Sequence, residues 1–129
     1  MTKRARFLIG LVVSAVLLMV AAANTAFAQE KGKAEKGKAT VKVLLDNDKV
    51  RVTENRYRPG DVGEEDRSQY RVNRTLQGGT LERIYPDGKK EKLELKTGQV
   101  RFLEPSKGGN YKVMNVGKTT VVNYVVRLK

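Results

Sequence analysis

The side chains that could carry out chemistry in this sequence are few in kind. Its 129 residues include no histidine and no cysteine, so the commonest general base, the commonest metal ligand and the thiolate nucleophile are missing. This excludes catalytic triads built on histidine or cysteine, most zinc and copper sites, and disulfide bonds. Carboxylates, tyrosines, arginines and lysines remain, and they suit the binding of charged groups or proton transfer between a carboxylate and a phenol.

The densest cluster of such side chains is the acidic run Glu64-Glu65-Asp66. Three carboxylates could begin a site for a hard cation, but Ca²⁺ takes six to eight oxygens and adjacent acids do not enclose it. We therefore expect this run to be a solvated loop.

The first 28 residues have the three parts of an export signal. Basic residues begin it, an apolar run of 17 residues follows from Phe7 to Ala23, and the small-residue site Ala26-Phe27-Ala28 ends it. The apolar run is shorter than the ~20 residues that span a bilayer, which favours a cleaved signal peptide helix over a membrane anchor. We expect cleavage after Ala28 and a periplasmic or secreted protein.

The mature chain is strongly basic. The whole chain has a net charge of +12, and loss of the signal leaves 23 of the 26 basic residues against 14 acidic ones, a charge of +9. Residues 29–40, QEKGKAEKGKAT, carry no large apolar side chain, so we expect a disordered linker whose lysines could attract an anionic envelope surface. We expect no nucleic-acid partner, because core packing explains most of the tyrosines.

From residue 41 onward, short β-branched segments alternate with turn signals such as Pro59-Gly60, Gly78-Gly79 and Pro86-Asp87-Gly88. The apolar residues show no 3.6-residue period, and the turn spacing is typical of antiparallel strands. Residues 41–129 are therefore predicted to form one all-β domain, a sandwich or barrel with a central last strand. The expected eight strands are residues 41–45, 50–58, 70–77, 80–85, 89–95, 99–103, 111–116 and 120–128.

The order of these turn residues resembles the small single-domain cupins. Pro59-Gly60 is followed nineteen positions later by Gly79, and then by TLERIYPDG at 80–88, KTGQV at 96–100 and Asn115-Val116-Gly117. The resemblance covers nearly all of residues 41–129 and implies a jelly-roll β-barrel. Cupins often pair through sheet edges, so the resemblance also implies a homodimer.

The resemblance implies a metal site as well, but other residue types stand at its ligand positions. Counting along the first cupin motif places its two histidines at Asp66 and Ser68, and its glutamate at Val72 or the neighbouring Asn73. The histidine of the second motif falls on Tyr111. One carboxylate cannot outcompete water for a transition metal, so we expect a metal-free protein without a cofactor.

An arginine could supply the positive charge that the metal would have provided. With unbroken alternation from Asp66, the face that lines the barrel would carry Ser68, Tyr70, Val72, Arg74 and Leu76. A guanidinium there would pair with Asp66 or with an anionic ligand. We predict a small-anion pocket, with a structural ion pair or an outward Arg74 as the alternatives. Its lining would be Asp66, Ser68, Arg74 and Tyr111.

Three functional hypotheses follow. The first is an exported, metal-free binding or structural module, and we expect this role rather than catalysis. The second is a cofactor-independent isomerase or lyase of a sugar or acid, with Asp66 as the base and Tyr111 as the acid. The third is an envelope-associated protein that binds anionic glycans or lipid headgroups through its basic residues.

Cleavage after Ala28 predicts a mature protein that begins at Gln29. The intact mass of the protein isolated from the producing cell measures this directly. A full-length species embedded in the membrane would contradict the assignment.

Overall fold

The computed structural model describes residues 35–129. The expected signal peptide and the first part of the expected linker lie outside these residues. The described part of the chain contains nine strands, and it includes no helix that could cross a membrane. The strands are β1 (Thr40–Asp46), β2 (Val50–Tyr57), β3 (Val62–Glu65), β4 (Arg71–Gln77), β5 (Gly79–Ile84), β6 (Lys90–Leu95), β7 (Val100–Leu103), β8 (Tyr111–Asn115) and β9 (Val121–Leu128).

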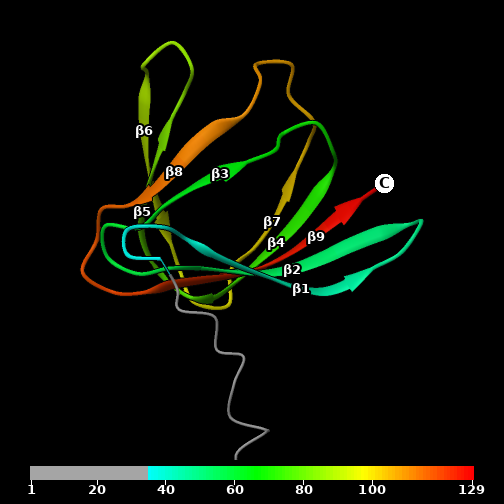
Figure 1. Cartoon of the computed structure of the whole chain (residues 1–129), viewed down its shortest axis with the longest axis horizontal. Coiled ribbons are helices and arrows are strands. Elements are labelled where there is room, and N and C mark those ends of the chain that lie inside the picture. Colours follow the sequence, from blue (N-terminus) through cyan, green and yellow to red (C-terminus); the bar gives the residue numbers. More distant parts are fainter. Residues whose placement is uncertain (1–34) are drawn as a thin grey trace, which may run out of the picture. The chain divides into compact units, whose positions relative to one another are not determined.

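The nine strands form two antiparallel sheets that face each other (Figure 1). One sheet has the order β1-β2-β9-β4-β7 and the other has the order β3-β8-β5-β6. Apart from β1–β2 and β5–β6, which are neighbours within one sheet, each strand lies in the opposite sheet from the strand before it, as in a jelly roll, and β9 lies in the middle of the larger sheet. The predicted all-β jelly-roll barrel is confirmed, with one strand more than expected.

The additional strand is β3, which contains two residues of the run that we expected to be a solvated loop. That expectation is wrong because β3 pairs with β8, with Glu65 opposite Tyr111. A Val-Gly-Glu-Glu segment has little strand preference of its own. Gly63 shows how closely the chain packs there, because a Cβ atom at this position would lie 3.0 Å from the Cβ of Ala39. Tertiary pairing therefore creates this strand.

The last residues of the expected linker belong to the barrel. The amide of Ala39 donates to the carbonyl of Val62 at 2.9 Å, and the amide of Val62 donates to the carbonyl of Gly37 at 3.0 Å. These bonds place the segment alongside β3 before the chain enters β1 at Thr40. The ordered domain thus begins a few residues earlier than predicted.

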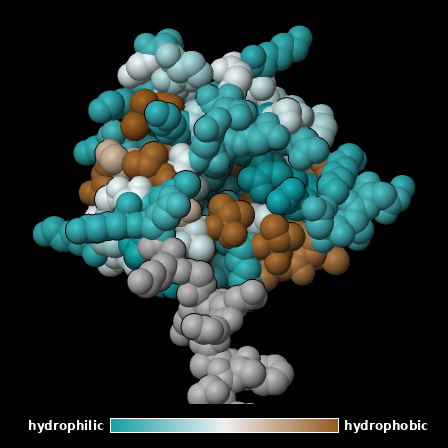
Figure 2. Space-filling model, in the orientation of Figure 1, coloured by the Kyte–Doolittle hydropathy of each residue, from teal (hydrophilic) through white to brown (hydrophobic). Residues whose placement is uncertain are grey.

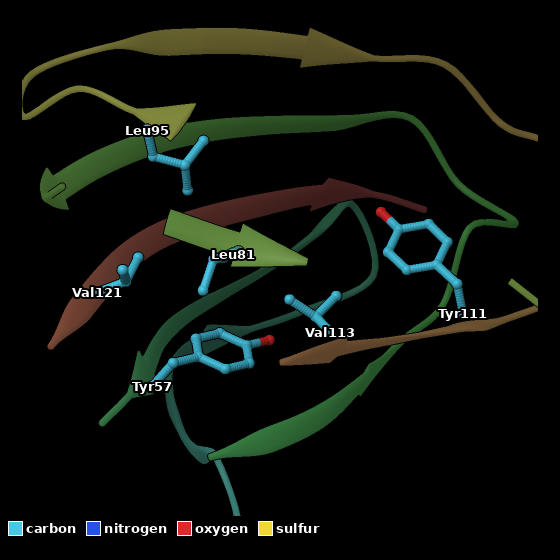
Figure 3. Packing of buried hydrophobic residues seen from close by; sticks show 6 residues of the cluster. All are labelled: Tyr57, Leu81, Leu95, Tyr111, Val113 and Val121. Carbon is cyan, nitrogen blue, oxygen red and sulfur yellow. The ribbon is translucent and has the colours of Figure 1, made fainter. Parts of the chain in front are cut away.

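An apolar cluster fills one part of the space between the sheets (Figure 3). Its residues come from both sheets, and β9 contributes Val121, which is fully buried. Tyr111 lies at one end of the labelled group, away from Leu95 and Val121. The buried members are Tyr57, Leu81, Leu95, Tyr111, Val113 and Val121.

The inner face of the five-stranded sheet is largely polar, and this overturns the predicted alternation. In β4 the buried residues are Arg71, Asn73 and Thr75, whereas Arg74 and Leu76 are exposed on the outer face. Alternation counted from Asp66 predicted that Val72, Arg74 and Leu76 face the barrel interior. A shift of one residue exchanges the two faces of a strand completely.

Gly78 marks a place where two chain segments touch. A Cβ atom there would overlap the carbonyl oxygen of Leu95 and approach the amide of Thr97 to 2.9 Å. We expect Gly78→Ala to lower the free energy of unfolding by about 3 kcal/mol, because the backbone of residues 95–97 must move away from the new Cβ atom. Gly88→Ala is the control, since open space surrounds Gly88 and only its φ of 85° opposes a side chain, at a cost of about 1 kcal/mol. Urea unfolding measures both, and equal losses would contradict the close contact.

Candidate functional site

Arginines gather inside the barrel beyond the apolar cluster. They come from the β3–β4 loop and from strands β4, β5, β7 and β9, so the fold brings together residues that lie far apart in the sequence. Glu65, at the end of β3, is 7% exposed, and its carboxylate faces these arginines in the barrel interior. The inward arginines are Arg67, Arg71, Arg83, Arg101 and Arg127.

Glu65 is held by two donors. The hydroxyl of Tyr111 donates to its Oε2 at 3.0 Å, and Nη1 of Arg71 donates to the same atom at 3.2 Å. Tyr111 reaches Glu65 because the two residues are directly opposite in the β3–β8 pair. Burial raises the pKa of Tyr111, and the negative charge of Glu65 raises it further. The phenol therefore stays protonated at neutral pH and acts as the donor.

Arg67 and Arg83 pack against aromatic rings. The guanidinium carbon of Arg67 lies 5.1 Å from the ring centre of Tyr111 and 5.3 Å from that of Tyr85. Arg83 lies 5.1 Å from the ring centre of Tyr111. Contacts of this kind attract a cation to the ring face and restrict its orientation. Both arginines are thereby held next to Tyr111.

A loop between β7 and β8 closes over Arg67. Nη2 of Arg67 donates to Oγ of Ser106, and the amide of Ser106 donates to the carbonyl of Arg67 at 2.9 Å. The pocket beside this loop is open to solvent and has a volume of about 160 Å³. It is lined by Arg67, Arg71, Arg83, Tyr85, Leu103, Glu104, Ser106 and Tyr111.

Positive charge exceeds negative charge in the region of this pocket. The five inward arginines, of which Arg67, Arg71 and Arg83 line the pocket, face four carboxylates, those of Glu65 inside, of Glu91 and Glu104 at the rim and of the exposed Asp66 near Arg127. Glu91 is exposed and lies 3.6 Å from Nη1 of Arg83. Burial lowers the pKa of the Arg101 guanidinium, and the charge of Arg83 lowers it further. The arginines thus repel one another across the site.

Several buried polar atoms near the pocket lack a hydrogen-bond partner within residues 35–129. They include the Nε atoms of Arg71, Arg83 and Arg101 and the Oδ1 atom of Asn73. Buried polar atoms are normally hydrogen-bonded, so the three Nε donors and the Oδ1 acceptor are available to a ligand or to solvent.

Of the four residues predicted to line the pocket, the structure places only Tyr111 there. Oδ1 of Asp66 accepts a hydrogen bond from the amide of Ser68 at 2.8 Å in an exposed turn, and this bond holds the pKa of Asp66 below its usual value. Arg74 is exposed on the outer face of β4. The predicted cluster is therefore not assembled, and Asp66 and Tyr111 do not face one space as an acid–base pair.

The sequence analysis missed the inward neighbours of those positions. The interior residues are Glu65, Arg67 and Arg71, each one position before Asp66, Ser68 and Val72. Counting back from Gly78 instead of Gly79 would have placed the motif on Arg71. Both Gly78 and Gly79 can be the starting point of this count. The count from Gly79 turns Val72 and Leu76 inward, and this is the more apolar face of the strand.

This donor set does not fit a transition metal. The carboxylate of Glu65 is already bound by Arg71 and Tyr111, and guanidinium groups repel a metal cation. Within residues 35–129, no group of three or more aspartate, glutamate, histidine or cysteine side chains is placed to hold a metal ion.

The geometry agrees with comparisons to solved structures, whereas the sequence matches no family model and no curated protein. A cupin domain from Bordetella pertussis is 27% identical, with a TM-score of 0.64 over 74% of this chain and 98% of that one. A Klebsiella pneumoniae protein with a double-stranded β-helix domain is 18% identical, with a TM-score of 0.56 over 74% of this chain and 80% of that one. The polyketide cyclase RemF from Streptomyces resistomycificus is 20% identical, with a TM-score of 0.52 over 70% of this chain and 65% of that one.

The chain is a double-stranded β-helix protein. More specifically, it has the fold of the cupin domains, as its turn residues predicted.

The pairing of Glu65 predicts a large effect of its charge on stability. Glu65→Gln keeps the shape of the side chain but leaves Arg71 and its neighbours without their internal counter-charge. We expect the free energy of unfolding to fall by about 3–5 kcal/mol. Glu64→Gln is the matched control, because Glu64 is exposed on the opposite face of the same strand, and it should change stability by less than about 0.5 kcal/mol. Urea unfolding distinguishes them, and similar effects would contradict the assigned strand faces.

Proposed function

We propose that the protein is an exported cupin-like module that binds a small anion in the arginine-lined pocket and needs no metal to do so. The observation that carries this proposal is the convergence of Arg67, Arg71 and Arg83 on one small pocket. Two of these arginines have a buried Nε atom without a partner among the described residues. Export is supported by the basic start, apolar run and small-residue site of residues 1–28.

Electrostatics favours an anionic ligand. Enclosing several like charges away from water is costly, and a bound anion offsets both their repulsion and their desolvation. Hydrogen bonds between guanidinium groups and carboxylate or phosphate oxygens are short and strong, and they are often bidentate. Because Tyr85 and Tyr111 already orient two of the guanidiniums, little further ordering is required on binding.

The small volume of this open pocket favours a small ligand. Sites for drug-sized molecules measure about 300–1,000 Å³, and this pocket measures about 160 Å³. Phosphate and short dicarboxylates fit such a volume better than a long-chain or polycyclic substrate. The proposed ligand class is therefore a compact anion with two or more negative oxygens.

Thermal unfolding in the presence of a defined panel tests the proposal. The panel is phosphate, oxalate, malonate, succinate and gluconate, with glucose as the neutral control. A ligand at about 100 times its dissociation constant stabilises the native state by about 2.7 kcal/mol, which raises the melting temperature of a domain this size by about 10 °C or more. We expect this shift from at least one compact dianion and none from glucose.

Substitution locates the binding site. Arg83→Gln and Arg67→Gln should each weaken binding of the responding anion by about tenfold or more, because a charge-assisted hydrogen bond contributes about 1.5–3 kcal/mol. Arg51→Gln is the control, since Arg51 is an exposed arginine paired with Asp46 outside this pocket. Isothermal titration calorimetry measures all three. No response to any anion, or equal losses in the three variants, would contradict the proposal, as would one transition metal per chain in elemental analysis.

A further inference from the structure

Polar side chains occupy the interior of this barrel as well as its surface. Hydrophilic (teal) side chains cover much of the face shown in Figure 2, with brown side chains among them. Inside, the five-stranded sheet buries asparagines and threonines that do not belong to the apolar cluster, namely Thr53, Asn55, Asn73, Thr75 and Asn123. Buried polar groups need hydrogen-bond partners, so a member of this set that lacks one is a place where a further group can bind.

Asn73 lies next to the arginine-lined pocket in the strand register. It follows Arg71 by two residues on the inner face of β4, and Arg71 is directly opposite Leu103 in the β4–β7 pair. Both Arg71 and Leu103 line the pocket. The next pair along the inner face of the same two strands is Asn73 and Arg101. Because two residues of a strand span about 7 Å, this pair forms the layer adjacent to the pocket.

Asn73 and Arg101 have complementary unpartnered atoms. The Oδ1 atom of Asn73 and the Nε atom of Arg101 are both buried, and neither has a hydrogen-bond partner within residues 35–129. Directly opposite residues of an antiparallel pair have Cβ atoms about 4.5–5.5 Å apart, so the two side chains are neighbours. On its other side Asn73 is opposite Val125, whose side chain offers no polar atom. Asn73 and Arg101 therefore present one acceptor and one donor side by side.

A carboxylate alone cannot satisfy both of these atoms. An ionised carboxylate only accepts hydrogen bonds, so it can pair with Nε of Arg101 but not with Oδ1 of Asn73. A hydroxyl group can donate to the amide oxygen and accept from the guanidinium at the same time. Burial lowers the pKa of the Arg101 guanidinium, and the nearby charges of Arg83 and Arg71 lower it further. A ligand held by the arginines of the pocket can thus reach this pair with a neighbouring hydroxyl group.

We propose that the ligand of the arginine-lined pocket is a compact hydroxy acid. Arg67, Arg71 and Arg83 hold its carboxylates, and its hydroxyl group lies between Asn73 and Arg101. This inference rests on the proposed anion-binding function and narrows its ligand class from compact anions to hydroxylated ones. Where the hydroxyl-bearing carbon is chiral, the separate contacts to carboxylate and hydroxyl select one enantiomer.

Isothermal titration calorimetry of the protein as isolated from the cell, at neutral pH, compares matched pairs of ligands. The pairs are hydroxymalonate with malonate, and each enantiomer of malate with succinate. All of these acids are dianions at this pH, so only the hydroxyl group differs within a pair. We expect the hydroxylated acid of the better-binding pair to have a dissociation constant at least about tenfold lower. The acid without the hydroxyl leaves Oδ1 of Asn73 unpartnered, and such a loss is costly in a buried site.

Asn73→Leu removes the amide oxygen but keeps a side chain of similar volume. It should bring the two dissociation constants of the pair to within about twofold of each other, because neither acid then has a partner at this position. Asn55→Leu is the matched control and should keep the preference. Asn55 is an equally buried asparagine with an unpartnered Oδ1 among residues 35–129, but it lies on β2, which β9 separates from β4. Circular dichroism confirms that both variants remain folded.

The outcomes separate this inference from the function on which it rests. Equal binding of the hydroxylated and unhydroxylated acids by the unaltered protein, or binding of phosphate alone, would overturn the hydroxy-acid proposal while the anion pocket stands. A preference that survives Asn73→Leu would overturn the assignment of the hydroxyl contact to Asn73. No binding of any of these acids or of the anions in the thermal panel would overturn the proposed function as well.

Discussion

The orientation of β4 governs both surfaces of the larger sheet. Because side chains alternate along a strand, placing Arg71, Asn73 and Thr75 inside forces Val72 and Leu76 outside. The usual distribution of polar and apolar residues is thereby reversed on this strand. The barrel gains a polar interior at one end, and its outer wall gains apolar surface. The arginine-lined pocket and the apolar outer face are therefore two consequences of one strand register.

Glu65 makes the polar interior compatible with folding. A buried cluster of arginines without a counter-charge would destabilise the native state strongly. One carboxylate, bound by both Arg71 and Tyr111, offsets part of this repulsion and orders the residues around it. It leaves an excess of positive charge, with unpartnered Nε atoms in the described residues. An anionic ligand would neutralise this excess positive charge and accept hydrogen bonds from these Nε atoms.

The apolar cluster and the arginine cluster occupy different parts of the barrel interior. Residues such as Leu81, Val113 and Val121 are buried from water and pack the two sheets together. The arginines lie beyond Tyr111, which belongs to both groups because its ring packs with the core and its hydroxyl contacts Glu65. Rigid packing on one side can thus hold the guanidiniums of the other side in place.

The sequence by itself determined the all-β class, most strand limits and the cupin-like order of turns, because turn residues and β-branched segments act locally. It identified Tyr111 as an interior residue but not Glu65 or Arg71. The strand around Glu65 exists only through its pairing with β8, and the face of β4 depends on a shift of one residue between Gly78 and Gly79. Only the tertiary structure decided these points, since strand pairing and sheet register depend on contacts between residues far apart in the chain.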